Sequence, residues 1–320
     1  MKRLIICLLI IMSVLTGCGK TIEKEAINIG INQLVEFDAL DQCRDGFIQA
    51  LEDNGYTDGK NIKIDYQNAQ GEMNIAQTIS KKFASDKKDL IFAIATPSAQ
   101  ASYNTTKDIP ILISAVTDPV KAGIVESMDK PGTNVSGTSD YLPVEKQLDL
   151  MKKLLPNIKK IGVLYNTSEV NSEVQVDELK NAAVDYEIIT MGITSTNEVN
   201  NAINSLVKKI DVLFVPTDNL VVSSLPIIVR STLQEKIPII ASEQGSVENG
   251  ALATAGINYY KLGYETGKMA VEILKGAEIS NMPLKISEET DIFINEDTLK
   301  ALGIPAPSIE NIIYVKTKQN

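Results

Sequence analysis

One short pattern occurs twice in this chain: an apolar run ends in a polar tip, and an Ile-Pro-Ile segment follows. The runs span residues 90–95 and 212–215, and their tips carry Thr96 and Thr217. An apolar run of this length, stopped by a helix-capping loop, is typical of a buried parallel strand. Open α/β sheets bind ligands beyond the carboxyl ends of such strands. Two like halves that face each other therefore predict a cleft for a small molecule.

Matched features recur along both halves at nearly constant offsets. The pairs are Gly30 with Gly162, Thr96 with Thr217, and Pro110 with Pro238. Strand-like and helix-like segments alternate, which predicts parallel sheets with right-handed crossovers. We therefore expect an α/β fold of two Rossmann-like lobes joined by a three-segment hinge. The expected boundaries are residues 26–138 with 256–283 for lobe 1, and residues 139–255 with 284–320 for lobe 2.

The first residues have the layout of an export signal. Lys2 and Arg3 precede an apolar run over residues 4–15 that is too short to span a bilayer. The sequence Leu-Thr-Gly-Cys that ends at Cys18 resembles a bacterial lipobox. We therefore expect residues 1–17 to be a signal peptide, Cys18 to be lipidated and residues 18–25 to be a tether. A lipidated Cys18 would anchor the folded part at the extracytoplasmic face of the cell membrane; the alternative is a chance cysteine after an ordinary signal peptide.

Composition argues against several classes of function. The chain has 41 acidic and 31 basic residues, a net charge of −10 and no histidine. Nucleic-acid binding relies on basic patches, so we expect no nucleic-acid partner. Without histidine, a nucleophile elbow or a metal-ligand cluster, the sequence indicates no catalytic residue, cofactor or metal. Cys43 is expected to be a small buried side chain on a helix.

The loops expected at the cleft are acidic. They contain no Lys or Arg but carry several carboxylates: Glu36, Asp38, Asp118, Asp140, Glu169, Asp218 and Glu243. Phosphates and dicarboxylates usually recruit Arg or Lys. A ligand with a positive group suits this site better.

A single ligand carboxylate can still be held beside a helix N-terminus. Thr96 and Ser98 offer hydroxyl donors at such a position, and Asp118, Asp140 or Asp218 could receive an ammonium group. Together these groups describe a site for a zwitterion, hence for an amino acid. Taken singly, each of them could equally be a helix cap.

Several stretches between about residues 27 and 304 carry a family resemblance. They are Gln33-Leu34-Val35-Glu36, Ala39-Leu40-Asp41, Arg44-Asp45-Gly46-Phe47, Thr96-Pro97-Ser98-Ala99-Gln100, Val116-Thr117-Asp118-Pro119, Ser139-Asp140, Val215-Pro216-Thr217-Asp218-Asn219 and Gly256-Ile257-Asn258-Tyr259. In combination they resemble the tryptophan/tyrosine-type substrate-binding lipoproteins of ABC importers. The resemblance implies a type I periplasmic-binding fold. It also implies a monomeric receptor that captures an aromatic amino acid (Tyr, Phe or Trp) and delivers it to the transmembrane subunits of an ABC permease.

The resemblance and the loop chemistry together name the residues expected at the ligand. They are Val35, Glu36, Phe37, Thr96, Ser98, Thr117, Asp118, Ser139, Asp140, Asn166, Ser168, Thr217, Asp218, Asn219 and Glu243. One departure from the family is Phe37, which stands where close relatives are expected to carry His. This change concerns the side-chain preference of the site.

The same residues bear on other classes of function. A hydrolase with an Asp or Glu pair would lack a histidine and a nucleophile elbow. A transcriptional regulator with similar lobes would need a basic helix-turn-helix where the signal peptide stands. A surface adhesin on the same scaffold, or a receptor for another small amine-bearing solute, stays open as an alternative.

Overall fold

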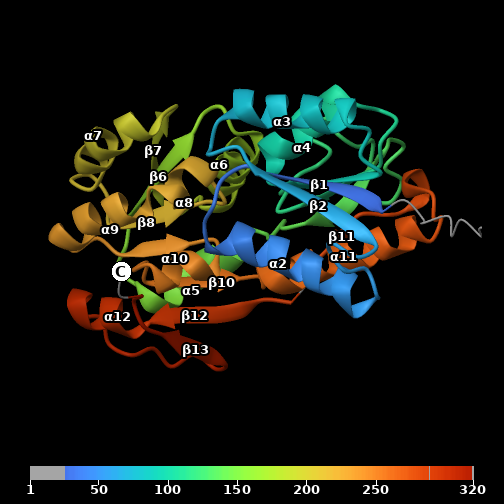
Figure 1. Cartoon of the computed structure of the whole chain (residues 1–320). Helices are drawn as coiled ribbons and strands as arrows, with labels where there is room; N and C mark the ends of the chain where they lie inside the picture. The colour runs from blue at the N-terminus through green and yellow to red at the C-terminus, as the bar shows by residue number, and fades with distance from the viewer. Residues whose placement is uncertain (1–25, 288, 319–320) are drawn as a thin grey trace, which may run out of the picture.

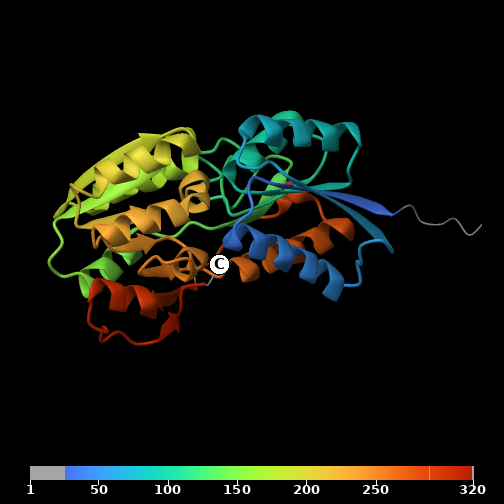
Figure 2. The same ribbon diagram turned by 60° about the vertical axis from the view of Figure 1, so that its left-hand side comes forward.

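The structure, a computed structural model, describes residues 26–287 and 289–318. The expected signal peptide, the lipidated Cys18 and the tether lie outside these residues. The described chain forms two α/β lobes that lie side by side along the long axis of the molecule (Figures 1 and 2). In this part of the chain, no helix has both the length and the apolar character needed to cross a membrane.

Lobe 1 is built on a six-stranded parallel sheet in the order β11-β5-β4-β3-β1-β2. Its strands are β1 (Ile27–Gln33), β2 (Ile62–Asn68), β3 (Leu90–Ile94), β4 (Ile111–Ser114), β5 (Val135–Ser139) and β11 (Lys285–Ile286). All side chains of β3 and β4 are buried, because helices cover both faces of the sheet.

Lobe 2 is built on a seven-stranded sheet in the order β13-β12-β10-β9-β8-β6-β7. Its strands are β6 (Lys160–Asn166), β7 (Glu187–Ile193), β8 (Val212–Val215), β9 (Ile239–Ala241), β10 (Ala253–Gly256), β12 (Asp291–Asn295) and β13 (Ile312–Val315). The order β7-β6-β8-β9-β10 repeats the order β2-β1-β3-β4-β5 of lobe 1, which confirms the two Rossmann-like halves predicted from the sequence. Strand β12 departs from the repeat and runs antiparallel to β10.

Four long helices cover the sheet of lobe 1. They are α2 (Asp38–Asp53), α3 (Met73–Ser85), α4 (Thr96–Thr105) and α11 (Tyr259–Leu274). Figure 1 shows α3 and α4 on one side of this sheet and α2 with α11 on the other. Helices α2 and α11 cross at glycine, since a Cβ atom on Gly263 would lie only 1.8 Å from the carbonyl oxygen of Cys43. Cys43 is fully buried in this contact.

The helices of lobe 2 pack on both faces of its sheet. They are α5 (Glu145–Leu154), α6 (Val170–Ala182), α7 (Thr196–Leu206), α8 (Asn219–Ser223), α9 (Leu225–Gln234), α10 (Gln244–Glu248) and α12 (Glu296–Leu302). Two buried clusters, one on each face, form the core of this lobe. The short helices α8 and α10 directly follow β8 and β9, so their first turns stand at the edge of the sheet that faces lobe 1.

The chain crosses between the lobes three times. It leaves lobe 1 after β5, returns after β10 into α11, and crosses again between β11 and β12. Ser139 and residues 285–286 belong to the first sheet and Gly256 to the second, so the crossovers lie one to three residues beyond the boundaries expected from the sequence.

Candidate functional site

Loops that follow the strands of the two sheets meet across a closed cleft. Thr117 follows β4 and Thr217 follows β8, and their hydroxyl oxygens lie 3.1 Å apart. Phe37, just before α2, packs against the hydrophobic cores of both lobes. The carboxyl ends of the two sheets therefore share one crevice, which is where open α/β folds bind ligands.

Three adjoining cavities occupy this cleft. The outer pocket, of about 270 Å³, lies at the rim between α2, α8, α9 and α10. The inner chamber shares Phe37, Val222 and Glu243 with the outer pocket. The deep chamber shares Asp140 and Thr217 with the inner chamber. The inner and deep chambers each have a volume of about 10 Å³, room for about one water molecule.

Two carboxylates face the inner chamber with one unpaired oxygen each. Asp140 Oδ2 accepts a hydrogen bond from the Tyr259 hydroxyl at 2.8 Å, and Glu243 Oε1 accepts one from the Ser246 amide at 2.6 Å. Among the described residues, Asp140 Oδ1 and Glu243 Oε2 are buried without a partner. Burial raises the pKa of Asp140, and it raises the pKa of Glu243 to about 7. A buried acceptor without a donor is costly, so these atoms mark a place for a ligand donor.

Thr96 supplies a third unpaired group. Its hydroxyl is buried without a partner in the described chain, and it begins α4 directly after Ala95, whose φ is +79°. Ala115, after β4, also has a positive φ of +55°. Such backbone strain is often found at ligand sites. Ser98 instead donates its hydroxyl to Asn32 within lobe 1, at 3.4 Å, and neither Thr96 nor Ser98 lines the three cavities.

The tip after β8 is held from within lobe 2. Gln175 donates a side-chain hydrogen bond to the Thr217 hydroxyl at 2.8 Å and accepts the Thr217 amide at 2.9 Å. Asp218 caps α8 by accepting the Val221 amide, and its other oxygen accepts the Asn166 amide at 2.5 Å. Both oxygens of Asp218 are therefore engaged inside lobe 2, whereas the sequence reasoning offered Asp218 to the ligand.

Glu169 lies beside Asp218 and is surrounded by amide donors. It accepts hydrogen bonds from the side chains of Asn166, Asn171 and Asn219. Burial raises the pKa of Asp218, and the charge of Glu169 raises it further. Asn219 also lines the inner chamber. The two carboxylates thus hold the tip in shape, and Asn219 connects this network to the cleft.

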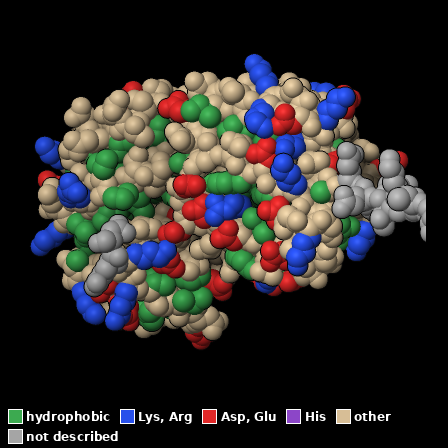
Figure 3. All heavy atoms as spheres, in the orientation of Figure 1, with side chains coloured by type: hydrophobic (Ala, Val, Ile, Leu, Met, Phe, Trp, Pro, Cys, Tyr) green, Lys and Arg blue, Asp and Glu red, His purple; other side chains and the backbone are tan. Residues whose placement is uncertain are grey.

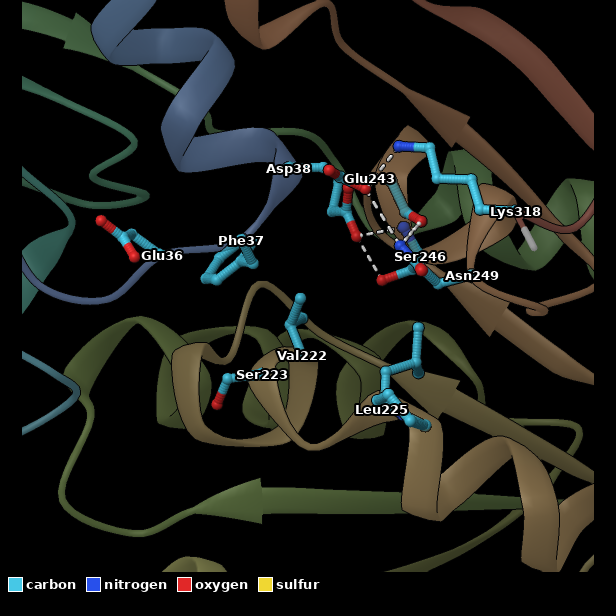
Figure 4. Close-up of a pocket in the computed structure, with 12 residues that line it drawn as sticks. Glu36, Phe37, Asp38, Val222, Ser223, Leu225, Glu243, Ser246, Asn249 and Lys318 are labelled. Atoms are coloured by element: carbon cyan, nitrogen blue, oxygen red, sulfur yellow. Dashed lines mark hydrogen bonds and ion pairs between the residues drawn. The ribbon is translucent and has the colours of Figure 1, made fainter. Parts of the chain in front are cut away.

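The segment before α2 is divided between the cleft and the surface. Figure 4 shows Phe37 beside Val222 in the outer pocket; Glu36 also lines this pocket, but its side chain points away from Phe37 and Val222. The exposed Glu36 carboxylate accepts a hydrogen bond from the Tyr66 hydroxyl at 2.9 Å. The carbonyl of the half-buried Val35 accepts the side-chain amide of Gln33 at 2.9 Å. Of this segment, only Phe37 borders the inner chamber.

Three other expected residues make hydrogen bonds within lobe 1 or within lobe 2. Asp118 accepts two backbone amides of the turn that follows it. The Ser139 hydroxyl donates to the Thr117 carbonyl at 2.9 Å, and the Ser168 amide donates to the Asn166 side chain at 3.0 Å. Ser139 therefore supports the Thr117 tip, while the other two bonds are local.

A cation that sequence reasoning missed reaches the outer pocket. Lys318 Nζ lies 2.8 Å from both Asp38 Oδ2 and Glu248 Oε2, and Asn249 also donates to Asp38 at 3.0 Å. Figure 4 shows Lys318 reaching toward Asp38 beside Glu243. We call Asp38, Glu248, Asn249 and Lys318 the polar clasp. No local sequence signal could have revealed it, because the pairing of β13 with β12 is what brings Lys318 to the cleft.

The charges near the cleft are arranged as pairs and not as a metal cluster. Within residues 26–287 and 289–318, no group of three or more His, Cys, Asp or Glu is placed to hold a metal ion. In the space-filling view, acidic and basic side chains lie next to one another over the middle of the face shown (Figure 3). Carboxylates, hydroxyls and apolar side chains line the three cavities, and Lys318 adds a cation to the outer pocket.

Comparison with known proteins decides the family. Residues 28–318 match the model of ABC transporter substrate binding proteins. The chain belongs to this family. A tyrosine-binding protein of Clostridioides difficile (strain R20291) is 58% identical over 97% of this chain and 94% of that protein. The receptor has the two-lobe fold of type I periplasmic-binding proteins, with a separate sheet of mainly parallel strands at the core of each lobe.

Two solved relatives show how the lobes of the receptor are arranged. A ligand-free, open substrate-binding protein with adhesive properties from Clostridium difficile is 62% identical, covers 92% of this chain and 100% of its own, and has a TM-score of 0.71. A Streptococcus pneumonia protein in complex with L-Trp is 37% identical, covers 90% and 100%, and has a TM-score of 0.86. The receptor is thus closer in shape to the L-Trp complex, although less similar to it in sequence.

Proposed function

We propose that the receptor binds an aromatic amino acid (Tyr, Phe or Trp) between its lobes and delivers it to the transmembrane subunits of an ABC importer. The names of the tyrosine-binding relative and of the L-Trp complex support this ligand class. In this role the receptor acts as a monomer and performs no catalysis. The proposal includes a lipid anchor on Cys18 that holds the receptor at the extracytoplasmic face of the membrane.

Two carboxylate oxygens of the inner chamber, which have no partner among the described residues, carry the proposal. Asp140 follows β5 of lobe 1, and Glu243 follows β9 of lobe 2. An ammonium group has three N–H donors and a positive charge, so it would satisfy both oxygens and offset the cost of burying them. A ligand held in this way touches both lobes, and it therefore stabilises the closed arrangement over the open one.

Hydroxyl groups are proposed to hold the ligand carboxylate. Thr217 lines both chambers, and Thr117 meets it from lobe 1. Thr96 adds an unpaired buried hydroxyl at the start of a ten-residue helix, where the helix dipole favours negative charge. An amino acid is larger than either chamber, so the lobes must part at the hinge to admit it and then close.

Calorimetric titration of the chain from residue 19 against the twenty amino acids tests the ligand class. We expect one site that binds at least one of Tyr, Phe and Trp and that rejects Asp and Glu. Absence of heat with all three aromatic amino acids would overturn the proposal.

A ligand without the amino group tests directly whether Asp140 and Glu243 recognise an ammonium group. We expect 3-(4-hydroxyphenyl)propionate, which is tyrosine without its ammonium group, to bind at least about tenfold more weakly than tyrosine. Equal binding of the two compounds would show that Asp140 and Glu243 do not recognise an ammonium group.

The proposed anchor has its own test. Replacement of Cys18→Ser is expected to abolish labelling of the protein by a radioactive fatty acid in growing cells and to release it from membranes. Labelling that persists in this variant would contradict lipidation at Cys18.

One observation favours a second function, because a solved relative is described as having adhesive properties. We infer that the anchored receptor also takes part in adhesion of the cell. Cells that lack the protein should then adhere less, and an Asp140→Asn variant should restore adhesion without restoring amino-acid binding. Unchanged adhesion in the deletion strain would remove this second function.

A further inference from the structure

The outer pocket is the cavity in the cleft with room for a side chain. Its volume is about 270 Å³, whereas the inner and deep chambers hold about 10 Å³ each. It shares Phe37, Val222 and Glu243 with the inner chamber, so the two spaces adjoin. A ligand whose ammonium group lies at Glu243 would therefore extend into the outer pocket by the shortest route.

One wall of the outer pocket is apolar. This wall is formed by Val222 from α8, by Leu225 and Pro226 from α9, and by Phe37 from lobe 1. Leu225 is 2% exposed and Val222 is 7% exposed, so the wall is part of the packed protein and not a loose surface. Figure 4 shows Phe37, Val222 and Leu225 along this side of the pocket. A ring inserted here would bury its faces against aliphatic and aromatic carbon.

The opposite wall is polar and has hydrogen-bonding capacity left over. Lys318 uses two N–H groups on Asp38 and Glu248, which leaves one of its three donors. Asn249 donates to Asp38 and to the Gly245 carbonyl, and its Oδ1 accepts no hydrogen bond from the described residues. One free donor and one free acceptor stand on the same wall. A phenolic hydroxyl, which both donates and accepts, complements this pair.

We propose, on the basis of the function proposed above, that the outer pocket is the side-chain subsite and that it selects a ring bearing a hydroxyl group. Tyrosine then binds with its ammonium group between Asp140 and Glu243, its ring beside Phe37 and Leu225, and its hydroxyl at the polar clasp. Phenylalanine fits the same apolar wall but leaves the polar wall unsatisfied, so the receptor discriminates against it.

The ratio of the dissociation constants for phenylalanine and tyrosine tests this assignment. We expect a ratio of about ten in the wild-type receptor, as for a hydrogen bond to a partly exposed charged group. Lys318→Met and Asn249→Leu should each lower the ratio toward one. Any effect on lobe closure changes both affinities alike and cancels in the ratio. Lys316→Met, an exposed lysine two residues from Lys318, should leave the ratio unchanged.

A change in the apolar wall provides an independent readout. Leu225→Ala should weaken the binding of tyrosine and of phenylalanine by similar factors. The melting temperature of the variant is recorded to confirm that it folds. If the ratio stays the same in the Lys318 and Asn249 variants and Leu225→Ala binds both ligands as the wild type does, the ring lies elsewhere and the assignment is wrong. If the wild-type receptor binds no aromatic amino acid at all, the proposed function fails first.

Discussion

Lys318 Nζ lies 2.8 Å from Asp38 Oδ2, and this ion pair joins the two lobes from opposite ends of the chain. Lys318 follows β13 of lobe 2, whereas Asp38 begins α2 of lobe 1. Lys318 is anchored on its own lobe, because its amide donates to the Glu248 carbonyl at 2.8 Å. The pair spans the cleft, so it forms when the lobes are closed and breaks when they part.

Removal of this pair should weaken ligand binding. Asp38→Ala deletes the acceptor of both Lys318 and Asn249. The side chains of Lys318 and Asp38 are 45% and 35% exposed, so solvent screens their attraction and the loss is at most about 1 kcal/mol. We expect the dissociation constant to rise about two- to fivefold, measured by calorimetry, and to depend less on salt than in the wild type.

An ion pair within one lobe provides the control for this prediction. Lys160 and Glu187 lie 3.4 Å apart within the sheet of lobe 2, and Lys160 is 46% exposed, close to the 45% of Lys318. Lys160→Met should leave both the affinity and its salt dependence unchanged. Equal effects of the two variants would mean that the clasp has no special part in closure.

Ligand affinity should depend on pH through Glu243. Burial raises its pKa to about 7, and the nearby charge of Asp38 acts in the same direction. In the proposed binding mode the ligand ammonium pairs with the ionised carboxylate, so binding below this pKa would have to release a proton. Affinity is therefore expected to fall below about pH 7, by at most tenfold per pH unit, in titrations at several pH values. Glu243→Gln should remove most of this dependence, and a wild-type affinity that stays constant would contradict the assignment.

The ligand-free protein should show the opposite trend in stability. The pKa of Glu243 is raised in the folded state above its ordinary value of 4.5, so the folded protein holds this proton more tightly than the unfolded chain. The resulting stability is fully present below 4.5 and is lost as the pH rises through about 7. Melting temperatures without ligand should therefore fall over this window relative to those of Glu243→Gln. A difference of the opposite sign would show that Glu243 is ionised before the ligand binds.

Gly245 sets how closely the lobes approach. A Cβ atom at this position would lie 2.7 Å from Asp38 Cβ in the other lobe and 2.9 Å from Glu243 Oε2. Gly245→Ala should hold the cleft slightly open and weaken binding. Small-angle scattering should then show less compaction on ligand addition than in the wild type. In the background of Asp38→Gly, which removes the opposing Cβ, Gly245→Ala should reduce the ligand affinity clearly less than it does in the wild type. Additive effects of the two changes on affinity would exclude the steric explanation.

The duplicated pattern around Thr96 and Thr217 was sufficient to predict the two lobes. Strand period and helix spacing are local properties, and parallel strands in succession permit few topologies. Strand β13 was not predicted, since its sequence lies between charged and polar segments and has no duplicate in the other half. The position of Lys318 was missed for that reason.

The candidate site was predicted at the level of loops and not of individual atoms. The loops around Asp140, Thr217 and Glu243 do face one cleft, because the carboxyl ends of parallel strands share an edge. Which oxygen of an acidic residue remains free depends on contacts from distant helices, such as those that Gln175 makes to the Thr217 tip. A sequence shows residue types at strand ends, but it does not show which of them are already used as caps.

Asp218 and Asp140 provide the sharpest test of the difference between an acid that serves as a helix cap and one that is free to meet the ligand. Both are buried acids that the sequence offered to the ligand ammonium, yet Asp218 accepts hydrogen bonds from the Asn166 amide, the Ser172 hydroxyl and the Val221 amide. In Asp218→Asn one acceptor oxygen is replaced by an NH₂ group, which cannot accept hydrogen bonds from these donors. The free energy of unfolding should therefore fall by about 1–3 kcal/mol in chemical denaturation.

Asp140→Asn should have the opposite pattern of effects: it should reduce ligand affinity and leave stability nearly unchanged. An asparagine can still accept the Tyr259 hydrogen bond, but its neutral side chain no longer balances the ligand charge. We expect a loss of affinity of at least about tenfold with little change in unfolding free energy. If Asp218→Asn instead lost affinity while keeping its stability, and Asp140→Asn did the reverse, the ammonium group would have to be reassigned to Asp218. In that case the hydrogen bonds around Asp218 would have to rearrange when the ligand enters.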